Sequence, residues 1–297
     1  MKTEEMIDGI VAKLLADYED DRAINKTDLA YQPNKEAILN ILKKLFKIIY
    51  PGYYHDRSYK LYSVRNDLAA TIEDVTYNLH KQVFTVFKYC NTYPYKDDRA
   101  IDSIAQEKVV SFLDTIPRIR EYLDTDLQAT LDGDPAAESK DEIILCYPGI
   151  YAITVYRIAH ELVKLDIPML PRIMTEHAHN LTGIDINPGA TIGKYFFIDH
   201  GTGIVIGETT VIGEHVKIYQ GVTLGALSTK GGQTLKSIKR HPTIGNNVTI
   251  YSGASILGGD TVIEDNVVVG GNAFITKSVE KDTQVIVKKP ELKESKI

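Results

Sequence analysis

Cysteine is scarce in this sequence: only Cys90 and Cys146 occur among its 297 residues. Two thiols far apart in the chain exclude the disulfide framework that small secreted domains use. We therefore predict that both are reduced, buried and structural. The N-terminus is acidic and lacks the pattern of a secretory or transit peptide, so a cytoplasmic protein is expected.

Long apolar runs are absent as well. The longest, residues 143–156, is interrupted by Pro148-Gly149 and is too short to cross a bilayer, so no membrane association is expected. Basic residues do not predominate, because 34 Lys and Arg stand against 40 Asp and Glu, a net charge of −6. This balance argues against nucleic-acid binding. With 43% hydrophobic and 25% charged residues, the chain has the composition of a folded globular protein.

Several catalytic signatures are missing. The sequence has no Gly-x-Ser-x-Gly elbow, no phosphate-binding P-loop and no His-Glu-x-x-His motif. The segment Gly201-Thr-Gly-Ile-Val-Ile-Gly207 resembles a dinucleotide fingerprint, but its spacing is wrong by one residue and no βαβ pattern surrounds it. We therefore predict neither a covalent nucleophile nor a metal site.

The first part of the chain, residues 1–182, has the pattern of an all-α domain. It contains few glycines before Gly149, and its apolar residues recur at spacings of three and four, which is typical of helices. Two further helices are expected near 148–165 and 169–181. Three stripes are predicted to be buried helix faces: Ile38, Ile41, Leu42, Leu45, Phe46 and Ile49; Leu68, Ile72, Val75, Leu79, Val83, Val86 and Phe87; and Val109, Phe112, Leu113, Ile116 and Ile119.

From residue 183 the apolar period becomes six. This period is the signature of a parallel β-helix, in which each turn stacks on the last and buries columns of aliphatic side chains. We predict a β-helix over residues 183–280, followed by a tail over 281–297. Three runs are in step: Ile186, Ile192 and Ile198; Ile206, Ile212, Ile218 and Leu224; and Ile244, Ile250, Ile256, Val262, Val268 and Phe274.

Two breaks in this period predict loops that leave the β-helix. The step from Ile198 to Ile206 contains two extra residues, which fall around Asp199-His200-Gly201. The stretch 226–243 has lost the aliphatic columns, and it carries Lys230, Lys236, Lys239, Arg240 and His241 without any acid. Because loops on a rigid scaffold commonly carry sites, we expect catalysis at the first break and anion binding at the second.

His200 is the candidate general base. Histidine titrates near neutral pH and can take a proton from a hydroxyl, while a neighbouring carboxylate such as Asp199 or Asp185 can orient the imidazole. Four other histidines have ordinary structural explanations. His160, His177 and His179 fall in expected helices, and His215 falls at a regular corner of the β-helix.

Several segments together resemble the serine O-acetyltransferase family. They are 183–193 (Gly-Ile-Asp-Ile-Asn-Pro-Gly-Ala-Thr-Ile-Gly), 198–209 (Ile-Asp-His-Gly-Thr-Gly-Ile-Val-Ile-Gly-Glu-Thr), 220–225 (Gln-Gly-Val-Thr-Leu-Gly), 240–242 (Arg-His-Pro), 134–136 (Asp-Pro-Ala) and 155–160 (Val-Tyr-Arg-Ile-Ala-His). The resemblance covers roughly residues 130–280. It implies an α+β fold with a left-handed β-helix, and acetyl transfer from acetyl-CoA to the L-serine hydroxyl, the first step of cysteine synthesis.

The resemblance also implies roles for individual residues. His200 is the expected base, with Asp185 as its orienting carboxylate. Asp134 and Asp199 are expected to hold the serine ammonium group, and Arg240 with His241 the serine carboxylate. Backbone groups around Gly225, Ala226 and Ser252 are expected to line the pantetheine arm of acetyl-CoA.

Assembly and partners follow from the same resemblance. The family places acetyl-CoA between adjacent β-helices of a trimer, and its helical domain joins two trimers into a hexamer. L-cysteine is expected to inhibit by feedback at the serine site. The chain ends at Ile297, and in this family a C-terminal Ile inserts into the active site of O-acetylserine sulfhydrylase, so that enzyme is a candidate partner.

Three alternatives remain at this point. A β-helix carbonic anhydrase would bind zinc through three histidines, and His200, His215 and His241 are the residues available for it. A second acyltransferase of the same fold would act on a sugar or an antibiotic. A non-catalytic scaffold is the third, although it would not need acid–base pairs at the breaks of its period.

Overall fold

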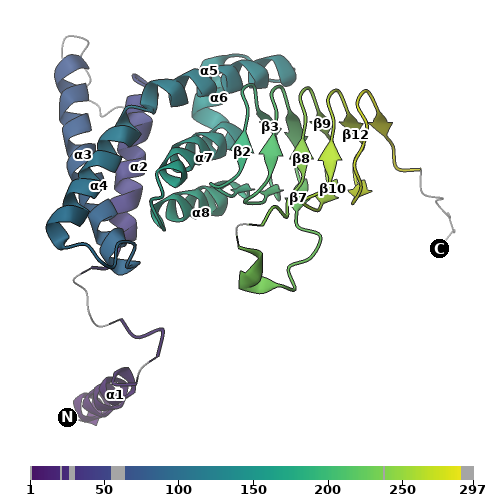
Figure 1. The fold of residues 1–297 in the computed structure, drawn as a ribbon. Coiled ribbons are helices and arrows are strands. Elements are labelled where there is room, and N and C mark those ends of the chain that lie inside the picture. Colours follow the sequence, from purple (N-terminus) through teal and green to yellow (C-terminus); the bar gives the residue numbers. More distant parts are fainter. Residues whose placement is uncertain (1, 21, 27–30, 55–63, 237, 289–297) are drawn as a thin grey trace.

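In the computed structural model, a bundle of helices is followed by a parallel β-helix (Figure 1). The structure describes residues 2–20, 22–26, 31–54, 64–236 and 238–288. One contiguous hydrophobic core runs from the helices into the β-helix. The helices are α1 (Lys2–Tyr18), α2 (Lys35–Ile49), α3 (Val64–Tyr89), α4 (Asp98–Leu113), α5 (Ile116–Gly133), α6 (Lys140–Cys146), α7 (Pro148–Lys164) and α8 (Leu170–Thr182).

Local sequence signals fix several helix ends. Asn34, Asp97 and Ser139 are N-caps whose side chains accept a hydrogen bond from the backbone N–H three residues later. Among the described residues no single helix is long and apolar enough to cross a membrane; α6 and α7 reach that length only together, and they are bent by 77°. Helix α1 lies apart from the other helices, with an exposed apolar side (Figure 1).

The β-helix has three parallel faces. Face A contains β1 (Asp185–Ile186), β4 (Val205–Ile206), β7 (Thr223–Gly225), β10 (Ser255–Leu257) and β13 (Phe274–Ile275). Face B contains β2 (Thr191–Ile192), β5 (Val211–Ile212), β8 (Thr243–Ile244) and β11 (Val262–Ile263). Face C contains β3 (Phe197–Asp199), β6 (Lys217–Tyr219), β9 (Thr249–Ile250), β12 (Val268–Val269) and β14 (Gln284–Val285).

The chain winds from face A to B to C and back to A, which creates three edges that we call AB, BC and CA. The period-six residues stack in register inside the coil: Ile186 pairs with Ile206, Ile192 with Ile212, and Ile198 with Ile218. The parallel β-helix expected from the period is therefore confirmed. Strand β14, within the stretch expected to be a tail, pairs with β12.

For the last three residues of the third predicted column, the prediction of which side chains are buried is wrong by one position. Phe274 is 72% exposed and Val262 also faces outward, whereas Ile263, Val269 and Ile275 are buried. The step from the buried Ile256 to the buried Ile263 is seven residues and not six, so Ile263 rather than Val262 pairs with Ile244. One inserted residue reverses which side chains face the core.

Other expectations about burial also need correction. Cys90 and Cys146 are both exposed and unpaired, because Cys90 follows the end of α3 and Cys146 ends the short α6. Leu68 is exposed near the start of α3. The third stripe is divided between two helices, since α4 ends at Leu113 and α5 restarts at Ile116-Pro117.

A buried ion pair joins the helices to the β-helix. The Asp126 carboxylate accepts hydrogen bonds from Arg157 Nε at 2.6 Å and Nη2 at 2.8 Å, and from the Phe196 N–H at 2.9 Å. The same guanidinium donates to the carbonyl oxygens of Ile192 and Gly193. Helices α5 and α7 are thereby fixed against the first turn of the β-helix, and this contact positions the site described next.

Candidate active site

Asp134 sits where helix α5 meets the β-helix. It is the C-cap of α5, and its Oδ1 accepts a hydrogen bond from the Ala136 N–H while its Oδ2 accepts one from the Tyr147 hydroxyl, each at 2.8 Å. These two bonds, in that order, lower the pKa of the Asp134 carboxyl. Lys217 of β6 fixes the end of α5, because its Nζ donates a hydrogen bond to the Gly133 carbonyl at 2.6 Å. Asp134 is therefore a fixed carboxylate.

Asp199 is the last residue of β3, and His200 follows it on edge CA. His200 has a φ of +57° and its side chain is 73% exposed, whereas the Asp199 side chain is only 15% exposed. Nδ1 of His200 lies 3.7 Å from Oδ1 of Asp199, which is an ion-pair distance but too long for a hydrogen bond. The imidazole thus faces solvent beside a half-buried acid.

The structure brings Asp134, Asp199 and His200 into one electrostatic neighbourhood. His200 contributes to the lowered pKa of Asp134. Asp199 contributes to the pKa of Tyr147, which is raised to about 12, mainly by the bond to Asp134. Three of the residues predicted from the sequence therefore interact electrostatically. A fourth member of this group, Tyr147, was not predicted from the sequence.

Asp185 lies elsewhere on the same edge. It opens β1 and pairs in register with Val205 of the next turn. Its carboxylate lies 3.9 Å from the guanidinium of Arg172, close to Glu176 and His179 of α8. Among the described residues no hydrogen bond or ion pair joins Asp185 to His200. The Glu176–His179–Asp185 group has the donors for a cation, but Arg172 already supplies the positive charge.

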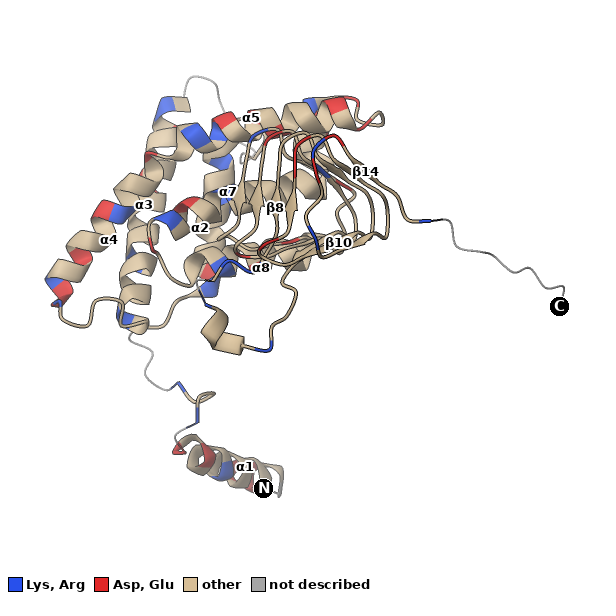
Figure 2. Ribbon diagram, turned by 45° about the vertical axis from the view of Figure 1, so that its right-hand side comes forward, with Lys and Arg blue, Asp and Glu red and all other residues tan. Residues whose placement is uncertain are grey.

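Arg240 and His241 lie on edge AB, at the end of the loop 226–243. This loop leaves the β-helix, contains the 3₁₀ helix η2 (Gly232–Leu235) and carries several basic residues (Figures 1 and 2). Arg240 forms an ion pair with Glu208 and donates to the Leu235 carbonyl. Its guanidinium is therefore already engaged by one carboxylate.

His241 is buried and neutral. Its Nδ1 accepts a hydrogen bond from the Thr209 N–H at 3.0 Å, so the ring proton resides on Nε2. The ring packs against Gly207, where an added Cβ would lie 2.2 Å from Nε2, so only glycine fits there. Burial and then the charge of Arg240 lower the pKa of His241 to about 4. His241 can therefore donate one hydrogen bond from Nε2 without carrying charge.

This pKa has a consequence for stability. Between pH 6.5 and about 4 the unfolded chain binds a proton at His241 and the folded chain does not, so the free energy of unfolding should fall as the pH is lowered through this window. We expect His241→Asn to remove part of that fall. Urea titrations at several pH values measure it. Parallel curves for the parent and His241→Asn would contradict the expectation.

The residues expected to contact acetyl-CoA fall on the same two edges. Gly225 ends β7 and Ala226 begins the loop on edge AB, whereas Ser252 lies on edge CA between β9 and β10. Gly225 faces Leu257 of the next turn, and an added Cβ there would lie 2.9 Å from Leu257 Cδ2. The candidate residues thus form two sets, one at edge CA and one at edge AB, and among the described residues no hydrogen bond or ion pair joins the two sets.

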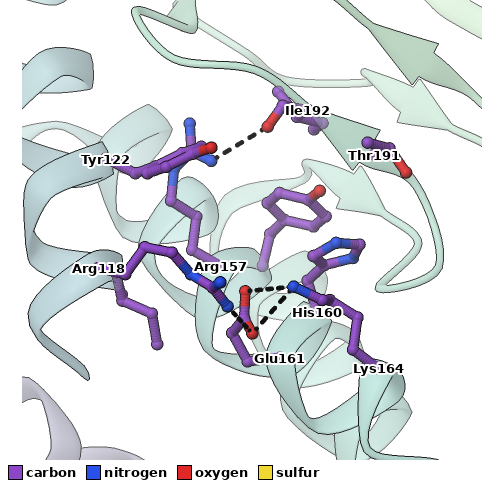
Figure 3. Close-up of a pocket in the computed structure, with 10 residues that line it drawn as sticks. Arg118, Tyr122, Arg157, His160, Glu161, Lys164, Thr191 and Ile192 are labelled. Atoms are coloured by element: carbon purple, nitrogen blue, oxygen red, sulfur yellow. Dashed lines mark hydrogen bonds and ion pairs between the residues drawn. The ribbon is translucent and has the colours of Figure 1, made fainter. Parts of the chain in front are cut away.

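A pocket of about 190 Å³ lies between α5, α7 and β2 (Figure 3). At its wall, the Glu161 carboxylate lies between Arg118 at 2.5 Å and Lys164 at 3.3 Å. His160 donates from Nδ1 to the Pro188 carbonyl, in line with its expected structural role. The residues that line this pocket include none of the candidate site residues.

Comparisons with known proteins agree with this arrangement. No family model matches the chain. A plasmid serine acetyltransferase of Synechococcus elongatus is 42% identical over 200 residues, 66% of this chain, and the chain spans only 62% of that relative's length. The crystal structure of serine acetyltransferase isoform 3 from Entamoeba histolytica, in complex with cysteine, is 34% identical, with a TM-score of 0.74 over 96% of this chain and 93% of that one.

A more distant structure, of a serine acetyltransferase in complex with CoA, is 26% identical, with a TM-score of 0.52 over 84% of this chain and 95% of that one. It therefore extends the likeness to a protein with CoA bound. The identity with the Entamoeba protein extends over almost the whole of both chains. The chain therefore belongs to the serine acetyltransferase family.

Proposed function

We propose that this chain transfers the acetyl group of acetyl-CoA to the hydroxyl of L-serine, giving O-acetyl-L-serine and CoA. The observation that carries the proposal is the cluster of Asp134, Asp199 and His200 in a chain of this family. Two acids suit an ammonium group, and an exposed imidazole beside them suits a hydroxyl that must lose its proton. The reaction is the first step of cysteine biosynthesis from serine.

The chemistry needs no covalent intermediate on the protein. Nε2 of His200 takes the proton from the serine hydroxyl as the oxygen attacks the thioester carbonyl carbon. The C–S bond then breaks, and the imidazolium returns the proton to the CoA sulfur. Because the thioester is already activated, the protein mainly aligns the reactants and supplies the base.

The remaining residues take the roles that the family resemblance implies. The Asp134 and Asp199 carboxylates hold the serine ammonium, and Asp134 is suited to this because its pKa is lowered. Arg240 and the Nε2–H of His241 hold the serine carboxylate, which then competes with Glu208 for Arg240. Asp185 orients His200 once the exposed imidazole turns toward β1. Gly225, Ala226 and Ser252 line the acetyl-CoA arm.

The assembly we propose is a trimer, or a dimer of trimers. Asp199 and His200 lie at edge CA, with Asp134 at the end of α5, whereas Arg240 and His241 lie at edge AB. In the proposed assembly, edges of two neighbouring β-helices together complete the serine site. Light scattering together with an activity assay tests this. An active monomer would refute a site shared between subunits.

The acceptor specificity tests the proposed function. We expect release of CoA with L-serine, much slower release with L-homoserine, whose hydroxyl is one methylene further from the ammonium, and none above background with simple sugars. A thiol reagent measures the released CoA. Faster release with a sugar would favour the alternative acyltransferase and would remove serine as the substrate.

L-cysteine is the inhibitor we propose. It shares the ammonium and carboxylate of serine, and the Entamoeba structure was determined with cysteine bound. Raising cysteine should increase the apparent KM for serine without changing kcat, and Arg240→Ala should weaken both ligands. Initial rates at several cysteine concentrations measure this. An unchanged rate at millimolar cysteine would contradict it.

Two further parts of the proposal concern the partner and the compartment. The candidate contact with O-acetylserine sulfhydrylase is through Ile297, which lies outside the described residues. Comparing the affinity of the full chain and of a chain lacking Ile297 for the sulfhydrylase tests it. The cytoplasm is the proposed location, supported by two exposed cysteines that form no disulfide.

A further inference from the structure

Tyr147 joins the Asp134 carboxylate to the start of α7, next to strand β3. It is the N-cap of α7, directly before Pro148, and its side chain is half-buried against the core. The start of α7 is pressed against β3, since a Cβ added to Gly149 would lie 2.7 Å from the Ile198 carbonyl oxygen. The same strand ends at Asp199, before His200. Tyr147 is thus fixed relative to the strand that presents the candidate base.

The contact between Tyr147 and Asp134 defines the orientation of the carboxylate. The tyrosine hydroxyl donates to Oδ2 and the Ala136 N–H donates to Oδ1, both at 2.8 Å. Each carboxylate oxygen can accept two hydrogen bonds and here accepts one, so each retains a lone pair for another donor. The Tyr147 pKa is raised to about 12, so the hydroxyl remains a donor throughout the neutral range.

We propose that Tyr147 is a positioning residue that fixes Asp134 to receive the substrate ammonium, and that it thereby sets the preference for an amino acid over a hydroxy acid. This inference rests on the proposed function and adds a residue that the family resemblance did not supply. In this role Tyr147 acts through Asp134, to which its hydroxyl donates. Without its hydroxyl, Asp134 keeps one backbone donor and is free to rotate about its side-chain bonds.

Tyr147→Phe is the direct test, because it removes one oxygen and keeps the ring. Loss of a hydrogen bond to a charged group corresponds to a change of about tenfold. We expect the KM for L-serine to rise by about that factor, with the KM for acetyl-CoA unchanged and kcat at saturating serine nearly unchanged. The inhibition constant of L-cysteine should rise in parallel.

Tyr53→Phe is the matched control. Tyr53 also donates its hydroxyl to an aspartate, Oδ1 of Asp141 at 2.5 Å, but it lies outside the candidate site. We expect this variant to keep the parental KM for serine. Thermal unfolding of both variants separates a loss of fold from a loss of positioning.

Two measurements distinguish positioning from a structural role. The first is the ratio of kcat/KM for L-serine to that for 3-hydroxypropionate, which lacks the ammonium; Tyr147→Phe should reduce this ratio, and partial unfolding would not. The second is a double-mutant cycle, in which Tyr147→Phe should have little further effect in an Asp134→Asn background.

The outcomes separate the inference from the proposed function. An unchanged serine KM in Tyr147→Phe, or an equal loss in the Asp134→Asn background, would overturn the role of Tyr147 while serine acetylation by the parent chain stands. If the parent chain does not acetylate serine, the proposed function fails first. An unchanged ratio between serine and 3-hydroxypropionate would overturn the specificity role alone.

Discussion

His200→Asn should lower kcat by ~10²–10⁴-fold and leave the affinity for acetyl-CoA nearly unchanged, because it removes general-base catalysis and little binding surface. Asparagine tolerates the positive φ of +57° at this corner, so the backbone should keep its conformation. Steady-state kinetics with L-serine and binding of CoA by calorimetry measure the two effects separately.

His215→Asn provides the matched control for this substitution. His215 has a φ of +56°, is exposed and stacks on Tyr195 at edge BC, so it has the same backbone strain without a role in the proposed site. We expect parental kcat in this variant. Near-parental turnover in a folded His200→Asn variant would remove His200 as the base.

Arg157→Met should lower the free energy of unfolding by about 3–5 kcal/mol, because it leaves the Asp126 carboxylate buried without its cation. Asp126 is fully buried, and Arg157 also donates to two carbonyl oxygens of the β-helix. Urea unfolding at one protein concentration measures the loss, since an oligomer's stability depends on concentration.

Arg118→Met is the control for the buried pair. Arg118 pairs with Glu161, but its own side chain is 49% exposed, and we expect a cost of at most about 1 kcal/mol there. Replacing both Asp126 and Arg157 by apolar residues should cost less than Arg157→Met alone, because no buried charge is then left. A loss below about 1 kcal/mol in Arg157→Met would contradict the importance of this contact.

The sequence predicts the β-helix well where only one phase of the period is aliphatic. Ile186 and Leu224 are buried as expected, because the residues on both sides of each are polar or glycine. In the last turns the predicted phase is wrong, because the inward and the outward position of each strand are both apolar, as in Val262-Ile263 and Phe274-Ile275. An insertion of one residue is invisible in such a pattern.

The site was predictable only in part. Asp134, Asp199 and His200 lie within electrostatic reach of one another, while the roles that the resemblance gives them stay predictions. Periodicity does not reveal which residue hydrogen-bonds a given carboxylate. Tyr147 was missed because an aromatic residue before Pro148 has the pattern of an ordinary helix start. The Tyr147–Asp134 bond joins two elements, and only the packed structure brings the two side chains together.

The product of the reaction tests the proposed activity most directly. The purified chain is incubated with acetyl-CoA and L-serine, and free CoA and acetylated serine are quantified together by mass spectrometry. We expect one O-acetyl-L-serine for each CoA released, dependent on serine and nearly abolished by His200→Asn. Serine-independent release of CoA, or no acetylated serine from a folded, oligomeric parent chain, would contradict acetyl transfer to serine.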